Sequence, residues 1–105
     1  MYLVRRVVRT QPGKAWEVAA HLVKICEAYE QKGRSKAQIY VGGVPADPNV
    51  AYVEWTQERI EPSRRSEIPE SVYTDDAKMR PLITSYDLEF YELVTPGKLS
   101  DRGFS

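Results

Sequence analysis

The stretch NVAYVEWTQERIEP, residues 49–62, decides the fold, because its first half alternates like a β-strand and its second half is polar and irregular. Residues 50–57 are rich in β-branched and aromatic side chains, which favour strands. Successive side chains of a strand point to opposite faces, so Glu54 lies with Tyr52 on one face and Trp55 lies on the other. The stretch therefore predicts a strand whose two faces have different neighbours.

Three more strands are predicted around this one. Residues 36–42 alternate apolar and polar side chains, and the turn that follows is rich in Pro, Asp and Asn. This pattern indicates a hairpin with residues 50–57. The chain begins and ends with further segments that alternate or are rich in valine. The predicted strands are residues 2–10, 36–42, 50–57 and 85–94.

Two helices are predicted between these strands. Residues 14–34 carry apolar side chains at three- and four-residue spacing, which is typical of an amphipathic helix. Residues 74–85 form the second predicted helix, with Thr74 as its N-cap and a kink at Pro81. Residues 58–71 contain two prolines and are predicted to be an irregular connection.

The order of these elements predicts an α+β fold of the ferredoxin-like βαββαβ type. In this fold, one four-stranded antiparallel sheet has two helices on one face, and the other face has no cover from its own chain. Residues 1–95 form the predicted domain, and we expect residues 96–105 to be a loosely held tail.

The composition is that of one ordinary soluble domain. The chain has 105 residues, of which 42% are hydrophobic, and 15 Lys and Arg balance 15 Asp and Glu. A net charge of zero gives no reason to expect binding to nucleic acid or to a membrane, and no apolar run reaches the roughly 18 residues of a membrane span. The lone Cys26 cannot form an internal disulfide, so we expect a reducing compartment, the cytoplasm.

An arginine stands on the sheet face that is predicted to lie under the helices. Alternation places Arg6 there together with Trp55 and Phe90, among otherwise apolar side chains. An unpaired buried charge is very costly. Arg6 therefore pairs with a carboxylate, extends to the edge of the sheet, or binds an anionic ligand, for which its planar guanidinium is well suited.

Several short segments of the sequence resemble those of one superfamily. QPGK at residues 11–14, YVEWTQ at residues 52–57 and MRPLITSYDLEFYELV at residues 79–94 are similar to the pattern of the dimeric α+β barrel superfamily. This superfamily includes the antibiotic-biosynthesis monooxygenase-like and NIPSNAP-like proteins. The resemblance covers residues 1–95 and implies a homodimer, in which two sheets pack face to face and so cover the open face.

The resemblance also implies where a ligand and a second copy of the chain would bind. Superfamily enzymes of the monooxygenase type hold their substrate between the helices and the sheet. The candidate ligand-binding residues are therefore Arg6, Trp55 and Tyr73. The candidate dimer-interface residues lie on the other sheet face and are Arg5, Arg9, Tyr52, Glu54, Glu89 and Tyr91.

We expect no metal and no cofactor. Haem-degrading members of the superfamily use an asparagine on the first strand, where this chain has Arg6, and a histidine on the second helix, where residues 58–85 contain none. The single histidine, His21, and the single cysteine are too few for a histidine- or cysteine-rich metal site.

Two functions stay open on this basis. The first is a cofactor-independent monooxygenase-like enzyme, or an isomerase, that acts on an aromatic or anionic small molecule. The alternative is a non-enzymatic dimeric module that binds a small ligand or serves in a stress response. The sequence does not decide whether the chain is an enzyme, since no general base or redox group is evident. The pairing of Arg6 and the presence of a cavity beside Trp55 are the features that test for a ligand site.

Overall fold

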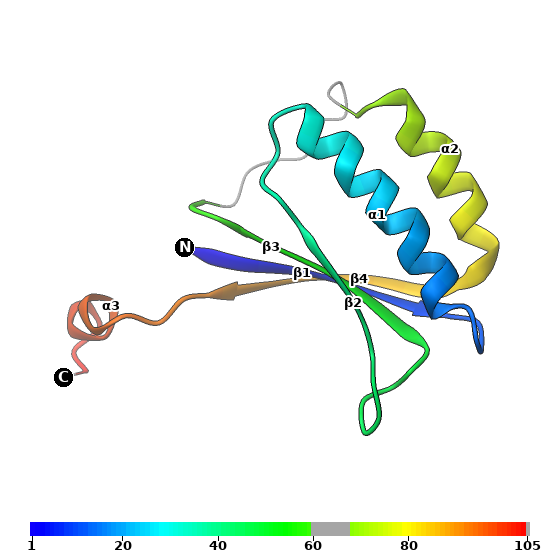
Figure 1. The fold of residues 1–105 in the computed structure, drawn as a ribbon. Coiled ribbons are helices and arrows are strands. Elements are labelled where there is room, and N and C mark those ends of the chain that lie inside the picture. Colours follow the sequence, from blue (N-terminus) through cyan, green and yellow to red (C-terminus); the bar gives the residue numbers. More distant parts are fainter. Residues whose placement is uncertain (60–67, 105) are drawn as a thin grey trace.

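The computed structural model describes residues 1–59 and 68–104 and contains the predicted order of strands and helices (Figure 1). Residues 60–67, which belong to the predicted irregular connection, lie outside the described residues. The elements are β1 (Tyr2–Thr10), α1 (Ala15–Gln31), β2 (Gln38–Val41), β3 (Val50–Gln57), α2 (Glu70–Met79), β4 (Ile83–Glu92) and a further helix, α3 (Pro96–Asp101).

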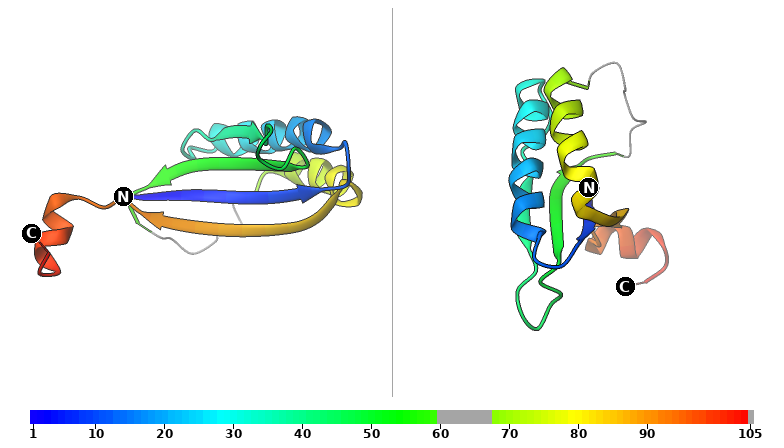
Figure 2. Two further views of the ribbon diagram at one scale, coloured as in Figure 1. Left: turned by 90° about the horizontal axis from the view of Figure 1, so that it is seen from below. Right: turned by 90° about the vertical axis from the view of Figure 1, so that its right-hand side faces the viewer.

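The four strands form one antiparallel sheet in the order β2-β3-β1-β4. On β1, Arg5 stands directly opposite Glu54 of β3 and Glu89 of β4. Both α1 and α2 lie on one face of the sheet, and no described helix covers the other face (Figure 2). The predicted α+β, ferredoxin-like fold is confirmed.

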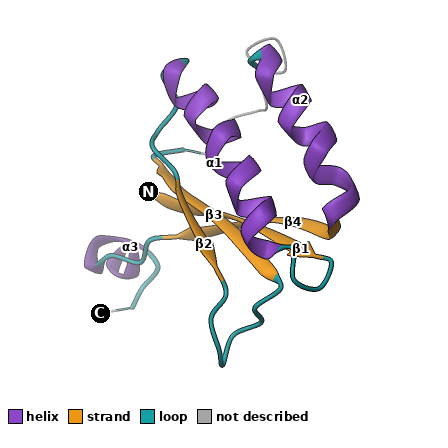
Figure 3. Cartoon of the chain, turned by 45° about the vertical axis from the view of Figure 1, so that its right-hand side comes forward, coloured by secondary structure: helices purple, strands orange, loops and turns teal. Residues whose placement is uncertain are grey.

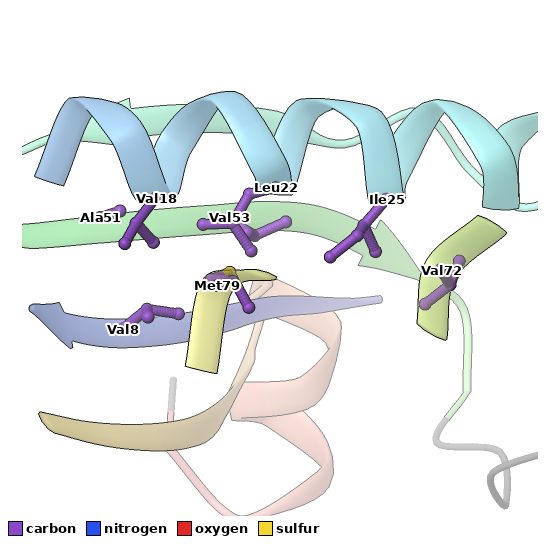
Figure 4. Close-up of a cluster of buried hydrophobic side chains, with 8 residues drawn as sticks. All are labelled: Val8, Val18, Leu22, Ile25, Ala51, Val53, Val72 and Met79. Carbon is purple, nitrogen blue, oxygen red and sulfur yellow. The ribbon is translucent and has the colours of Figure 1, made fainter. Parts of the chain in front are cut away.

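The hydrophobic core lies between α1 and the middle of the sheet. Helix α1 packs on β2 and β3, and α2 packs chiefly on α1. Valine, leucine and isoleucine side chains from these elements pack together, and each fully buried one contributes roughly 1.5–3 kcal/mol. The buried cluster consists of Val8, Val18, Leu22, Ile25, Ala51, Val53, Val72 and Met79 (Figure 4).

Helix α2 does not cover β4, although both lie toward the same side of the molecule (Figure 3). As a result, the side chains of Leu88 and Phe90 remain 45% and 42% exposed, even though they point to the helix-covered face. The sequence predicted the face of these residues but not their exposure. The uncovered part of this face leaves room for a cavity beside α1.

The second helix differs from its predicted bounds. It begins at Glu70 rather than after Thr74 and ends at Met79, where a single 3-10 turn, Arg80–Leu82, leads into β4. The earlier start follows from packing, since Val72 is buried against α1, and Pro69 provides an extended backbone at the N-cap. Pro81 lacks an N–H and so ends the regular helix, as expected of proline.

The C-terminal tail, residues 96–105 in the prediction, contains a short helix that was not predicted from the sequence. This helix, α3, extends away from the sheet beyond the end of β4 (Figure 1). The side chain of Thr95 caps this helix by accepting a hydrogen bond from the backbone N–H of Lys98, and Pro96 occupies its first position. Lys98 and Arg102 then bridge to Glu92 of β4.

Candidate ligand-binding site

An open cavity of about 1140 Å³ lies between α1, the sheet and the start of α2. Its floor is formed by Arg6, Val53, Trp55, Leu88 and Phe90 of the sheet, and its wall by Leu22, Ile25 and Cys26 of α1. Its mouth consists of residues 32–35, 57–59 and 68–70, where α1 and β3 end and α2 begins. A volume of this size accommodates a drug-sized molecule.

Arg6 is the charged group on the cavity floor. Its guanidinium carbon lies 5.7 Å from the centre of the Trp55 ring and 5.2 Å from the centre of the Tyr86 ring. Its Nε is buried and has no hydrogen-bond partner, and no carboxylate in the described part of the chain comes within 4.0 Å of the guanidinium. Two aromatic rings thus flank a cation whose counter-charge is not supplied by the described residues.

Two titratable neighbours of Arg6 are neutral around neutral pH. Burial raises the pKa of the Cys26 thiol to about 11, although the charge of Arg6 acts in the opposite direction. Partial burial also raises the pKa of the Tyr86 phenol, again against the influence of Arg6. Neither group forms an anion at pH 7, so neither neutralises Arg6.

The only histidine of the chain forms a contact outside the cavity. His21 Nδ1 lies 3.1 Å from Asp75 Oδ1, and both side chains are 16% exposed. This pair joins α1 to α2 and does not line the cavity. The carboxylates that do line it among the described residues, Glu58 and Glu70, stand at the exposed mouth rather than beside Arg6.

Neither a metal centre nor a membrane span is found in the part of the chain that the structure describes. No group of three or more His, Cys, Asp or Glu side chains is placed to hold a metal ion there. No helix within residues 1–59 and 68–104 combines the length and the apolar character needed to cross a bilayer.

The structure brings together two of the three residues predicted to bind a ligand. Arg6 and Trp55 both line the cavity, and the Trp55 indole donates a hydrogen bond of 2.8 Å to Gln57 Oε1. Tyr73 lies on α2, is 58% exposed and is not part of the lining. Sequence reasoning gave no role to Tyr86, whose ring lies under Arg6, or to Arg34 at the mouth.

The residues predicted to form a dimer interface gather on the open face of the sheet. Arg5 Nε donates to Glu54 Oε1 at 2.8 Å, and its guanidinium also lies near the rings of Tyr52 and Tyr91, at 5.9 and 5.5 Å. Tyr91 in turn donates to Glu89 at 2.8 Å. Arg9, nearer the end of β1, bridges to Asp87 at 2.9 Å. As interface residues, all of these remain predictions.

No protein-family model matches the sequence, and no curated protein matches it either. Solved structures do match its fold. An uncharacterized NIPSNAP domain protein from Burkholderia xenovorans has a TM-score of 0.69 at 11% identity, over 91% of this chain and 97% of that one. An antibiotic biosynthesis monooxygenase has a TM-score of 0.64 at 12% identity, over 90% and 100% of the two chains.

A third structure, of a Chloroflexus aurantiacus protein provisionally assigned to the antibiotic biosynthesis monooxygenases, has a TM-score of 0.58 at 23% identity, over 90% of this chain and 93% of that one. The chain therefore shares the fold of the NIPSNAP-like and monooxygenase-like proteins, which confirms the resemblance at the level of fold. Shared fold does not fix activity or substrate.

Proposed function

We propose that this chain binds an aromatic small molecule with an anionic group in the cavity, with Arg6 as the partner of the anion. The observation that supports this function is the state of Arg6, which faces an open cavity without a carboxylate from the described residues. Trp55, Leu88 and Phe90 offer apolar and aromatic surface to the rest of such a molecule.

The energetics favour an anion at this position. A half-buried cation without a partner is destabilising, because it loses part of its hydration without a compensating bond. A carboxylate or phenolate from a ligand restores that bond, and hydrogen bonds between charged groups are about twice as strong as neutral ones. The planar guanidinium is also rigid, so little freedom is lost when the bond forms.

Replacement of Arg6 by methionine tests this site, because it keeps a long apolar stem and removes the charge. Isothermal titration calorimetry with aromatic acids such as 2-naphthoate should detect binding to the wild type. Arg6→Met should weaken binding at least tenfold, since a hydrogen bond to a charged group contributes roughly 1.5–3 kcal/mol. Arg102→Gln on α3 is the matched control, because it removes an arginine that does not line the cavity.

Two results would contradict the proposed site. One is binding by Arg6→Met that is as tight as that of the wild type, with circular dichroism confirming that the variant is folded. The other is the absence of binding by every aromatic acid in a panel that varies in ring number and acid position.

We also propose that the chain is a homodimer that pairs through the open sheet face. This face carries the Arg5–Glu54 pair and two tyrosines in contact with Arg5, yet no described helix covers it. In the superfamily that the chain resembles, two such faces pack together. Sedimentation velocity over a concentration series measures the state directly, and a protein that stays monomeric at high concentration contradicts it.

A second candidate function is oxygenation of the bound molecule without a cofactor. Its support is the fold shared with a structure described as an antibiotic biosynthesis monooxygenase, together with a cation on the cavity floor that stabilises a phenolate. A phenolate is electron-rich enough to reduce O₂ directly, and the overall change converts a phenol and O₂ into a quinone and water. Oxygen consumption with naphthols or quinols that does not exceed the protein-free rate rules this candidate out.

We expect the binding to take place in a reducing compartment such as the cytoplasm. The free thiol of Cys26 lines the cavity, and its oxidation would place a polar or bulky group beside the ligand. Mass spectrometry of protein prepared without reductant checks this expectation, since a stable oxidised thiol in the active protein would contradict it.

A further inference from the structure

The arginines among the described residues fall into two groups by their partners. Those away from the cavity each bridge to a carboxylate in the described structure: Arg5 to Glu54, Arg9 to Asp87, Arg80 to Asp76 and Arg102 to Glu92. Arg6, Arg34 and Arg59 all line the cavity, and none of them has a carboxylate within 4.0 Å among the described residues. The described arginines away from the cavity are thus paired, whereas three on the cavity have no described partner.

Of these three, Arg6 and Arg34 lie over aromatic rings in the described structure, and they stand at different depths. Arg6 belongs to β1 and lies on the cavity floor, with its Nε buried. Arg34 is exposed at the mouth, just after the end of α1, where its guanidinium carbon lies 4.9 Å from the centre of the Tyr29 ring. Stacking on a ring holds a guanidinium in place while leaving the N–H groups at its edge available to a ligand.

Apolar side chains also line the cavity. Ile25 and Leu22 of α1 and Phe90 and Leu88 of β4 line the cavity together with the Tyr29 ring. Lys32 adds a further positive charge beside Arg34, and the carboxylates of Glu58 and Glu70 also stand at the mouth. The described lining therefore combines cations at its floor and at its mouth with hydrocarbon and aromatic surface.

We infer that the ligand is an elongated aromatic molecule with two acidic groups, one held by Arg6 on the floor and the other by Arg34 at the mouth. This inference rests on the proposed ligand-binding function and adds to it the second acidic group. A molecule with one acid leaves Arg34 without a counter-charge, whereas a diacid of suitable length neutralises both guanidinium groups and buries its rings in between. The carboxylates of Glu58 and Glu70 at the mouth repel an anion that lies beside them. A second acid that binds Arg34 is disfavoured only if it also approaches these carboxylates.

Matched pairs of mono- and dicarboxylates test this inference. The pairs are benzoate and terephthalate, 2-naphthoate and naphthalene-2,6-dicarboxylate, and biphenyl-4-carboxylate and biphenyl-4,4′-dicarboxylate, which increase in length. Calorimetry should show that at least one diacid binds wild-type protein tenfold or more tightly than its monoacid. In Arg34→Gln the ratio of diacid affinity to monoacid affinity should fall at least fivefold.

The readout is a ratio of two affinities for the same protein, so a general loss of stability in the variant does not imitate the effect. Arg102→Gln should retain the full advantage of the diacid. If no mono- or dicarboxylate binds, the proposed function fails together with this inference. If monoacids bind in an Arg6-dependent manner but no diacid binds more tightly, only the second acidic group is overturned. An advantage that persists in Arg34→Gln overturns the assignment of the second acid to Arg34.

Discussion

The Arg5–Glu54 pair provides a sensitive test of how the open sheet face is used. In a single chain this pair is partly exposed to solvent, since the Arg5 side chain is 34% exposed and the Glu54 side chain 23%. A pair with this exposure contributes roughly 0.2–1 kcal/mol. If two open faces stack in a dimer, the pair loses its water, and removal of one partner then leaves a buried charge that costs roughly 3–5 kcal/mol.

Glu54→Ala separates these two cases by a wide margin. Because a homodimer carries the substitution in both copies, a cost of about 3 kcal/mol per copy should raise the Kd of the dimer roughly 10⁴-fold. The melting temperature should fall by more than about 10 °C, because 1 kcal/mol corresponds to roughly 4–8 °C for a domain of about this size. Sedimentation velocity and thermal unfolding at one fixed protein concentration measure both quantities.

Asp76→Ala is the matched control, because it breaks the 2.7 Å pair between Asp76 of α2 and Arg80 at the end of that helix, away from the open face. That pair joins residues four apart across the helix end, and its loss should cost roughly 0.3–0.5 kcal/mol. If Glu54→Ala changes the dimer and the melting temperature no more than Asp76→Ala does, the open face is not a buried interface and the reasoning is refuted.

Three further predictions concern the cavity, the helix pair and the β2–β3 loop. At pH 8, Cys26 should react with a disulfide reagent roughly 100-fold more slowly in the folded protein than in urea, since its pKa is raised to about 11 in the folded protein. The raised pKa also implies a contribution to folding stability that is present below about pH 9 and is lost as the pH rises toward 11. Equal reaction rates in the folded and unfolded protein contradict both expectations. His21→Ala should lower the free energy of unfolding in urea by roughly 1–2 kcal/mol, and a double-mutant cycle with Asp75→Ala that gives no coupling contradicts a contact between the helices. Gly42→Ala should cost roughly 1–3 kcal/mol, because its Cβ would collide with a backbone carbonyl of the loop; the control Gly43→Ala, which has open space, should stay within about 0.5 kcal/mol, and equal costs at the two positions contradict this.

Side-chain alternation was sufficient to predict the sheet and the faces of its residues. Glu54 and Trp55 are neighbours in sequence and serve different faces, one opposite Arg5 and the other beside Arg6. This result depends only on the two-residue period of a strand. Because β1 and β3 are paired, side chains on the same face of the two strands lie together, and the observed register then sets which of them stand opposite.

The helix boundaries and the cavity depended on tertiary packing and were harder to predict. Thr74 followed by two aspartates is a typical helix start, but burial of Val72 against α1 extends α2 back to Glu70. The exposure of Phe90 could not be predicted, because it depends on where α2 stands above the sheet rather than on any local pattern. The α3 helix had a local signal that was missed, the cap residue Thr95 followed by Pro96.

Strand β1 contributes an arginine to each face of the sheet, since Arg5 faces the open side and Arg6 faces the cavity. The two guanidinium groups are joined by one peptide unit, so a shift of the strand moves both. If a ligand at Arg6 favours one position of β1, it also favours one position of Arg5 on the open face. The ligand then changes the free energy with which two copies of the chain associate. Thermodynamic linkage then requires the reverse as well: association must change the affinity for the ligand by the same factor. An apparent ligand affinity that depends on protein concentration would be the sign of this coupling.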